Sequence, residues 1–237
     1  MEIKVLGKYG PFAINGSTSS YLVKGKNSFA LLDCGSGIVK KLLNDNVLDK
    51  LSFIFLSHLH FDHISDIGVL SYAINFNLKG KKLKLYTHID DSLAFKTIQS
   101  MNAFEIINVE ENVTYTEGEF SFSCYKMTHP VTSYGIKIEN DGKVFAYSGD
   151  TTLNDNIYNL IKGASLILLD GAFLQKDFVG AKPHMSIKQV CEIAKESGIK
   201  TVVTHLSPTY SDNDVEYECN LFGGDVVVAK EDQTYKV

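Results

Sequence analysis

The sequence lacks several features that define specialised classes of protein. No apolar run approaches the roughly 20 residues of a membrane-spanning helix, and residues 1–6 enter a strand pattern without the apolar segment of a signal peptide. The chain has no CxxC pair, which argues against a disulfide framework and a thiolate zinc site. It also has no linker or low-complexity segment that would separate domains. We therefore predict one cytoplasmic domain with four buried free thiols. They are Cys34, Cys124, Cys191 and Cys219.

Positive charge is also scarce. The chain has 23 basic and 28 acidic residues and a formal net charge of -5. A long nucleic-acid footprint needs a positive field, so this balance argues against one. The basic cluster at 79–84 is interpreted as a solvated turn before a strand. At 237 residues with 44% hydrophobic content, the chain suits a single α/β domain with a full core.

Ligand-type side chains follow one apolar run directly. Residues 53–56 read as a strand buried on both faces, and four such residues come within the next seven positions. His58 and His60 can point the same way, which leaves Asp62 and His63 for a second ion. Imidazole and carboxylate groups are ligands that zinc prefers, although manganese and iron accept them as well. The segment therefore predicts two divalent ions, with zinc favoured.

Three other ligand-type residues each stand where a predicted strand stops. They are His129 after Met127-Thr128, Asp150 after Ser148-Gly149, and His205 after residues 201–204. Chemistry in open α/β sheets gathers at the carboxyl ends of strands. We therefore expect these residues to join the cluster after residues 53–56.

The run His58-Leu59-His60-Phe61-Asp62-His63 resembles the HxHxDH signature of the metallo-β-lactamase superfamily of metallohydrolases. The resemblance implies an αββα sandwich in which residues 1–237 form one domain. Histidine at position 60, where oxygen-reducing diiron members often carry glutamate, favours zinc hydrolysis. By resemblance, His58, His60 and His129 would hold one ion. Asp62, His63 and His205 would hold the other ion, and Asp150 would bridge the two.

A second resemblance concerns the segment around His184. The sequence predicts a helix over 186–197 with a capping box between Ser186 and Gln189, and its N-terminus is a natural cradle for a phosphoryl group. His184-Met185-Ser186 is similar to the HST motif of the ribonuclease Z branch, and Asp170 matches that branch's acidic motif more loosely. Leu169 and Thr209 depart from the histidine and arginine expected there. The alternative for His184 is a surface histidine in a capping loop.

The resemblance implies hydrolysis by a hydroxide held between two ions, with Asp62, Asp170 and His184 as catalytic residues. The interval from His129 to Asp150 is too short for the protruding arm of tRNA-processing relatives. We therefore expect a phosphodiesterase for small or cyclic nucleotides or short RNA, without a membrane partner. A lactonase or thioesterase, a tRNA 3′-end endoribonuclease and a metal-binding protein without turnover remain alternatives. The resembling family often forms homodimers.

Two residues and two segments complete the sequence-based expectations. Asp33 resembles a family aspartate that supports the ligand loop, and a helix-capping or turn role fits it equally well. His88 has no ligand-spaced partner beside it and is interpreted as structural. Residues 7–20 and 207–224 are predicted to be specificity loops.

Overall fold

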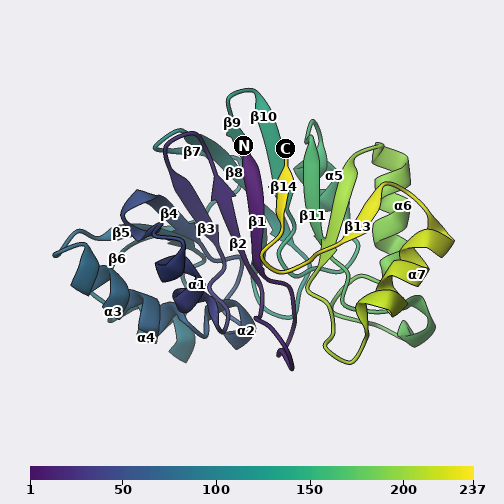
Figure 1. Cartoon of the computed structure of the whole chain (residues 1–237), viewed down its shortest axis with the longest axis horizontal. Coiled ribbons are helices and arrows are strands. Elements are labelled where there is room, and N and C mark those ends of the chain that lie inside the picture. The colour runs from purple at the N-terminus through teal and green to yellow at the C-terminus, as the bar shows by residue number, and fades with distance from the viewer.

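Two mixed β-sheets face each other, and helices cover the outer face of each sheet (Figure 1). The computed structural model describes all residues from 1 to 237. The first sheet contains, in spatial order, β14 (Thr234–Lys236), β1 (Glu2–Gly7), β2 (Ser20–Lys24), β3 (Phe29–Leu32), β4 (Leu51–Phe55), β5 (Leu83–Thr87) and β6 (Phe104–Asn108). The second contains β13 (Val226–Val228), β12 (Lys200–Thr204), β11 (Leu166–Asp170), β10 (Lys143–Tyr147), β9 (Ser133–Asn140), β8 (Phe120–Met127) and β7 (Thr114–Glu117).

The helices fall into two groups, one on each side of the paired sheets (Figure 1). The first group is α1 (Ile38–Asn44), α2 (Phe61–Ile64), α3 (Ile67–Asn77) and α4 (Leu93–Gln99). The second is α5 (Asp155–Ile161), α6 (Ile187–Ser197) and α7 (Asp212–Phe222). Short 3-10 turns lie at Leu48–Lys50 and Gln175–Asp177. None of the helices combines the length and the apolar character needed to cross a bilayer. This arrangement confirms the predicted αββα sandwich.

Three hydrophobic cores hold these layers together. One core lies between the sheets, and the other two lie under the helices of the first and second groups. Strand β4 contributes to two of them, because Phe53 stacks on Phe122 of the second sheet at 4.5 Å while Ile54 points to the opposite core. This alternation confirms that β4 is buried on both faces, as its apolar run predicts.

Parallel pairing brings the candidate ligands to one edge of the sandwich. Strands β3 to β6 are parallel, and β10 to β13 are parallel in the other sheet. Their carboxyl ends deliver His58 after β4, Asp150 after β10, Asp170 at the end of β11 and His205 after β12. The site is therefore built jointly by the two sheets.

The expectation that residues 207–224 form a loop is wrong. Helix α7 occupies most of that segment, and it begins after Ser211, whose hydroxyl accepts a hydrogen bond from the backbone N–H of Asp214. The buried side of α7 includes Glu218 beside Val215 and Cys219, so its apolar periodicity is weak. Residues 8–19 do connect β1 to β2 as a loop, and all four cysteines are buried and free.

Candidate metal centre

Tight backbone turns aim the site residues inward. Asp33 and His205 have φ angles of 58° and 54°, a left-handed conformation that is uncommon outside glycine. Gly149, with φ of 60°, precedes Asp150, and a Cβ at this position would lie 2.8 Å from Cβ of Ser57. Non-glycine residues persist in such conformations only where the surrounding fold holds them, and they are common at functional sites.

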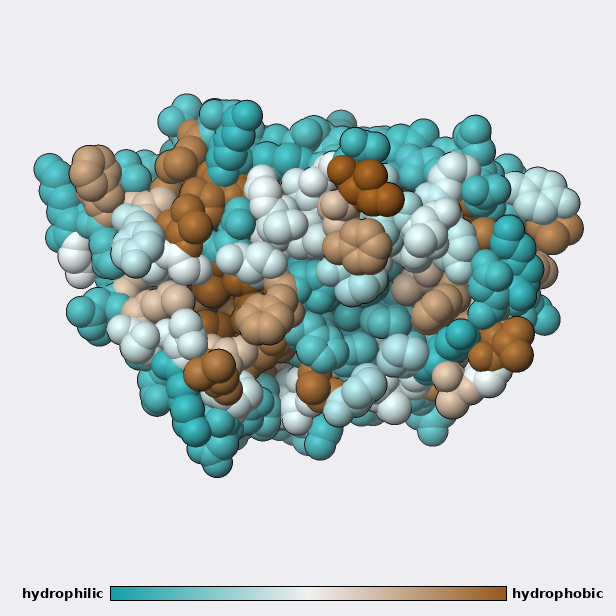
Figure 2. All heavy atoms as spheres, turned by 90° about the horizontal axis from the view of Figure 1, so that it is seen from below, coloured by the Kyte–Doolittle hydropathy of each residue, from teal (hydrophilic) through white to brown (hydrophobic).

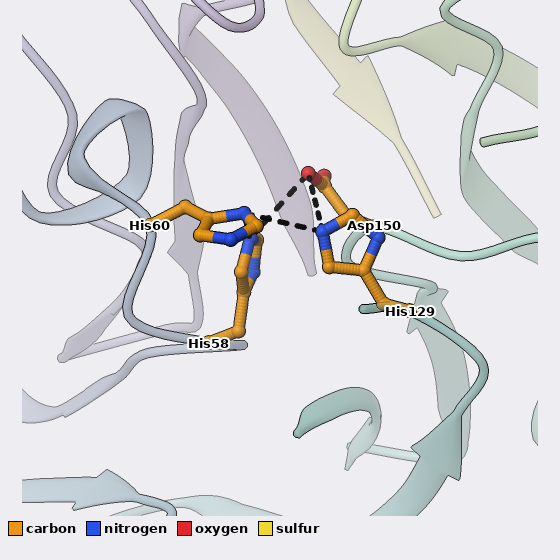
Figure 3. Close-up of side chains that lie close together, drawn as sticks. All are labelled: His58, His60, His129 and Asp150. Carbon is orange, nitrogen blue, oxygen red and sulfur yellow. Dashed lines mark hydrogen bonds and ion pairs between the residues drawn. The ribbon is translucent and has the colours of Figure 1, made fainter. Parts of the chain in front are cut away.

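The first cluster contains His58, His60, His129 and Asp150. Figure 3 shows the three imidazoles and the carboxylate converging, with His58 and His60 on one loop and His129 and Asp150 on other segments. Nδ1 of His60 lies 3.0 Å from Nε2 of His58 and 3.2 Å from Nε2 of His129. Oδ2 of Asp150 lies 3.5 Å from Nε2 of His58. One candidate ligand atom from each residue lies within 4.8 Å of all the others, which is close enough for one ion to contact them together.

The second cluster shares Asp150 with the first. Nε2 of His205 lies 3.1 Å from Oδ2 of Asp62 and 3.2 Å from Oδ2 of Asp150. Oδ1 of Asp150 lies 3.2 Å from Nε2 of His63. The structure thus brings together all seven residues predicted as ligands, and it places Asp150 between the two sets, where a bridging carboxylate belongs.

The buried polar atoms of the second cluster fit a cation. Nε2 of His63 and Oδ1 of Asp150 are both buried and have no hydrogen-bond partner. An unsatisfied buried polar group costs about 1–3 kcal/mol, and a bound ion would satisfy both atoms at once. The donor set of imidazole nitrogens and carboxylate oxygens is also one that suits zinc, manganese or iron.

The protonation of the histidines in the first cluster also suits metal binding. Burial lowers the pKa of His58, His60 and His129, and the neighbouring His63 lowers that of His58 further. Burial would likewise lower the pKa of His63, but the carboxylates of Asp150 and Asp33 raise it. The first cluster therefore presents neutral imidazoles, which is the form that binds a metal ion. A cation bound at His63 would replace the positive charge that the protonated imidazole places next to the carboxylate of Asp150.

Asp33 supports the ligand loop and does not cap a helix. Its carboxylate accepts hydrogen bonds from the backbone N–H of Ser57 at 2.7 Å, from Tyr147 Oη at 2.7 Å and from Nδ1 of His63 at 2.8 Å. The first N–H groups of α1 bond instead to the carboxylate of Asp66. Of the two roles open for Asp33, the structure favours orientation of a candidate ligand.

A second histidine–carboxylate pair lies beside the ligand clusters. Nδ1 of His184 lies 2.8 Å from Oδ2 of Asp170 and 3.9 Å from Oδ2 of Asp150. Asp170 is fully buried and also accepts hydrogen bonds from the backbone N–H groups of Thr151 and Ala172. Burial lowers the pKa of His184, but Asp170 outweighs it and raises that pKa to about 9. Nearby cations would oppose this rise.

At the start of the helix after His184, several of the donors expected to cradle a phosphoryl group are already hydrogen-bonded within the protein. The capping box of α6 is present, but it uses the N–H groups of Ser186 and Gln189. The N–H of Ile187 bonds to the carbonyl of Phe173. These three N–H groups are therefore satisfied within the protein and are not free to bind a phosphoryl group.

Sequence reasoning missed several supporting residues. Tyr147 and Ser57 bond to Asp33, and the carbonyl of Pro183 accepts from Nδ1 of His129 at 3.1 Å. These contacts join segments far apart in the chain, and no local motif marks them. His88 lies outside both clusters, with its ring 6.3 Å from that of Tyr134.

The fold and site agree with a match to known proteins. Residues 30–205 match the family model described as the beta-lactamase superfamily domain. The chain therefore belongs to the metallo-β-lactamase superfamily of metallohydrolases.

Individual relatives refine this class. The chain is 32% identical to the probable metallo-hydrolase YhfI of Bacillus subtilis, with 97% of each chain covered. The crystal structure of YhfI superposes with a TM-score of 0.89 and 99% coverage of both chains. Ribonuclease Z of Brevibacillus brevis is 26% identical over 86% of this chain and 83% of its own length. Human tRNase Z, short form, at 17% identity and a TM-score of 0.78, shows the shared fold alone.

Proposed function

We propose that the protein is a phosphodiesterase with two divalent metal ions, acting on small or cyclic nucleotides or short RNA. The observation that carries this proposal is the His184–Asp170 pair, 2.8 Å apart, beside two ligand clusters that share Asp150. His58, His60 and His129 would hold one ion, Asp62, His63 and His205 the other, and Asp150 both. Two such ions supply activation of a water and stabilisation of the attacking and leaving oxygens of an in-line displacement.

The residues around the ions divide the remaining tasks. Asp170 holds Nδ1 of His184, which leaves Nε2 as the ring nitrogen available to a substrate. A water that has released one proton to solvent bonds through its oxygen to phosphorus as the ester P–O bond breaks, and His184 gives a proton to the departing alcohol. Asp62, whose Oδ2 lies 3.6 Å from Nε2 of His63 and 3.1 Å from Nε2 of His205, would serve as a ligand and would add negative charge at the site.

The interval between His129 and Asp150 favours small substrates. This interval consists mainly of the plain hairpin β9–β10, joined by the two residues Asp141 and Gly142. It contains no protruding arm for a folded RNA, so tRNA 3′-end cleavage is the weaker alternative. The metal clusters alone suit a lactonase or thioesterase equally well, and that class is the main alternative.

Three further expectations remain predictions. Zinc is the favoured metal, with manganese and iron as alternatives on the same ligands. A homodimer is supported by exposed apolar side chains on α1 and α3, which are Leu43, Val69, Tyr72 and Phe76. Sedimentation velocity would measure the oligomeric state. A cytoplasmic location is supported by the four free cysteines.

A substrate panel tests the proposal. We would measure initial rates of zinc- and manganese-loaded protein on bis(p-nitrophenyl) phosphate, a phosphate monoester, a lactone and a thioester. We expect preferential cleavage of the diester. Turnover of the lactone or thioester with none of the diester would assign the site to the carboxyl hydrolases.

A further inference from the structure

Apolar side chains border one side of the site. The β1–β2 loop carries Phe12 and Ile14, which are 53% and 66% exposed. The same loop lies directly against the metal centre, because a Cβ at Gly10 would collide with the imidazole of His205. Two large apolar groups therefore stand in solvent close to a candidate metal ligand.

Other apolar side chains stand on segments that carry site residues. Phe61 lies between His60 and Asp62 and is 76% exposed, while Val131 follows His129 by two positions and is 40% exposed. The ring of half-buried Phe173 lies 6.0 Å from that of His184. We call the five residues the apolar rim. They are Phe12, Ile14, Phe61, Val131 and Phe173.

The space-filling view agrees with this arrangement. Figure 2 shows the face that carries the β1–β2 loop and α2, with brown and tan side chains around a teal centre. Scattered exposed apolar residues are normal on a protein, but a group gathered at a catalytic mouth is typical of ligand binding.

The charges near the rim do not suit a polyanion. The sequence contains no arginine, the residue that recognises phosphates in a bidentate manner. Lys8, at the start of the loop, is already paired with Asp212, at 2.5 Å between Nζ and Oδ1. Lys182 lies over the ring of Phe173, with its Nζ 4.9 Å from the ring centroid. Binding of a long strand needs many phosphate contacts, whereas stacking on aromatic rings needs none.

We propose that the apolar rim selects small phosphodiesters with a single phosphate and a flat aromatic group such as a nucleobase. The aromatic group belongs to the alcohol that stays bound to phosphorus after cleavage. This inference rests on the proposed function and narrows its substrate class. Stacking of a base on an aromatic side chain is worth roughly a tenfold change in affinity or more. The rim thus contributes through substrate binding, while the metal clusters and His184 carry out the chemistry.

The test compares two diesters with the same leaving group and the same charge. These are methyl p-nitrophenyl phosphate and thymidine 5′-(p-nitrophenyl phosphate). We expect the wild type to prefer the thymidine ester. Phe12→Ala should lower kcat/KM for that ester by about tenfold, mainly through KM, and change the methyl ester by less than about twofold.

Matched variants keep the test specific. Ile14→Ala is a second rim variant, and Phe76→Ala, which removes an exposed ring on α3, should leave the preference unchanged. Equal rates on both esters, or an equal loss on both in Phe12→Ala, would overturn the role of the rim while the phosphodiesterase proposal stands. Cleavage of neither ester would overturn that proposal and the rim with it. The inference would also be overturned if a ten-nucleotide thymidine strand inhibited the protein far more strongly than thymidine monophosphate does.

Discussion

Single residues in this molecule have roles that depend on their partners. Six of the seven histidines belong to the clusters of candidate ligands at the site, and each lies next to a carboxylate or another imidazole. His60 and His184 differ in what they face. His60 points at two histidines that are candidate ligands, whereas His184 is held by Asp170. Residue-scale experiments can therefore separate metal binding from proton transfer.

His184→Ala should separate these two functions. We expect turnover of a diester with an alkyl leaving group to fall by roughly a hundredfold or more, because the leaving alcohol loses its proton donor. Metal content, measured by mass spectrometry of the dialysed protein, should be unchanged. Loss of an ion in this variant would make His184 a metal ligand, which the group formed by Asp150, Asp170, His184 and His205 also allows. His88→Ala is the matched control.

Asp33→Asn should weaken metal binding without removing any ligand. The substitution replaces one accepting oxygen with an N–H₂ group that faces the donors of Ser57, Tyr147 and His63. Loss of such an orienting partner lowers metal affinity by about 10–100-fold. Titration of zinc against a chromophoric chelator measures the change, with Asp45→Asn on the surface as the control. Unaltered affinity would show that Asp33 serves the fold alone.

At the scale of elements, the turns at the ends of strands connect the two sheets. Glu119, in the β7–β8 turn, accepts hydrogen bonds from the backbone N–H groups of Lys26, Asn27 and Ser28 in the β2–β3 turn. Partial burial by itself raises the pKa of Glu119, but these donors outweigh it and lower that pKa to about 2. The carboxylate therefore ties the first sheet to the second.

Glu119→Gln should destabilise the protein in a pH-dependent way. The folded state lowers this pKa, so the bonds stabilise fully above the unfolded value near 4.5 and are lost as pH falls towards about 2. At pH 7 we expect a loss of about 1 kcal/mol in the free energy of unfolding, because the group is partly solvated. Urea unfolding at several pH values should show the difference shrinking below pH 4.5. A difference independent of pH would contradict the charge-based explanation.

The sequence anticipated elements where local patterns are strong. The buried strand β4 and the capping box of α6 follow from runs of a few residues. Helix α7 was missed although Ser211 and Asp214 form a readable capping box, because the helix has no clear apolar stripe. The cradle expected at α6 is partly occupied for another reason. One of its donors, the N–H of Ile187, bonds to the carbonyl of Phe173, a contact that only the tertiary fold creates.

At the scale of the whole molecule, the site exists because the two sheets end at one edge. The motif at residues 58–63 predicted its own share of the candidate ligands, and the ends of predicted strands added His129, Asp150 and His205. The support of Asp33 by Tyr147 and of His129 by the carbonyl of Pro183 crosses from one sheet or loop to another. No local pattern encodes such contacts, so they required the structure.

The metal content of the purified protein tests the central claim most directly. After zinc loading and gel filtration, we expect about two ions per chain in the wild type. We expect Asp150→Ala, which removes the residue shared by both clusters, to retain clearly fewer. A wild type that saturates at one ion, or an Asp150→Ala variant that keeps two, would contradict a dinuclear site bridged by Asp150.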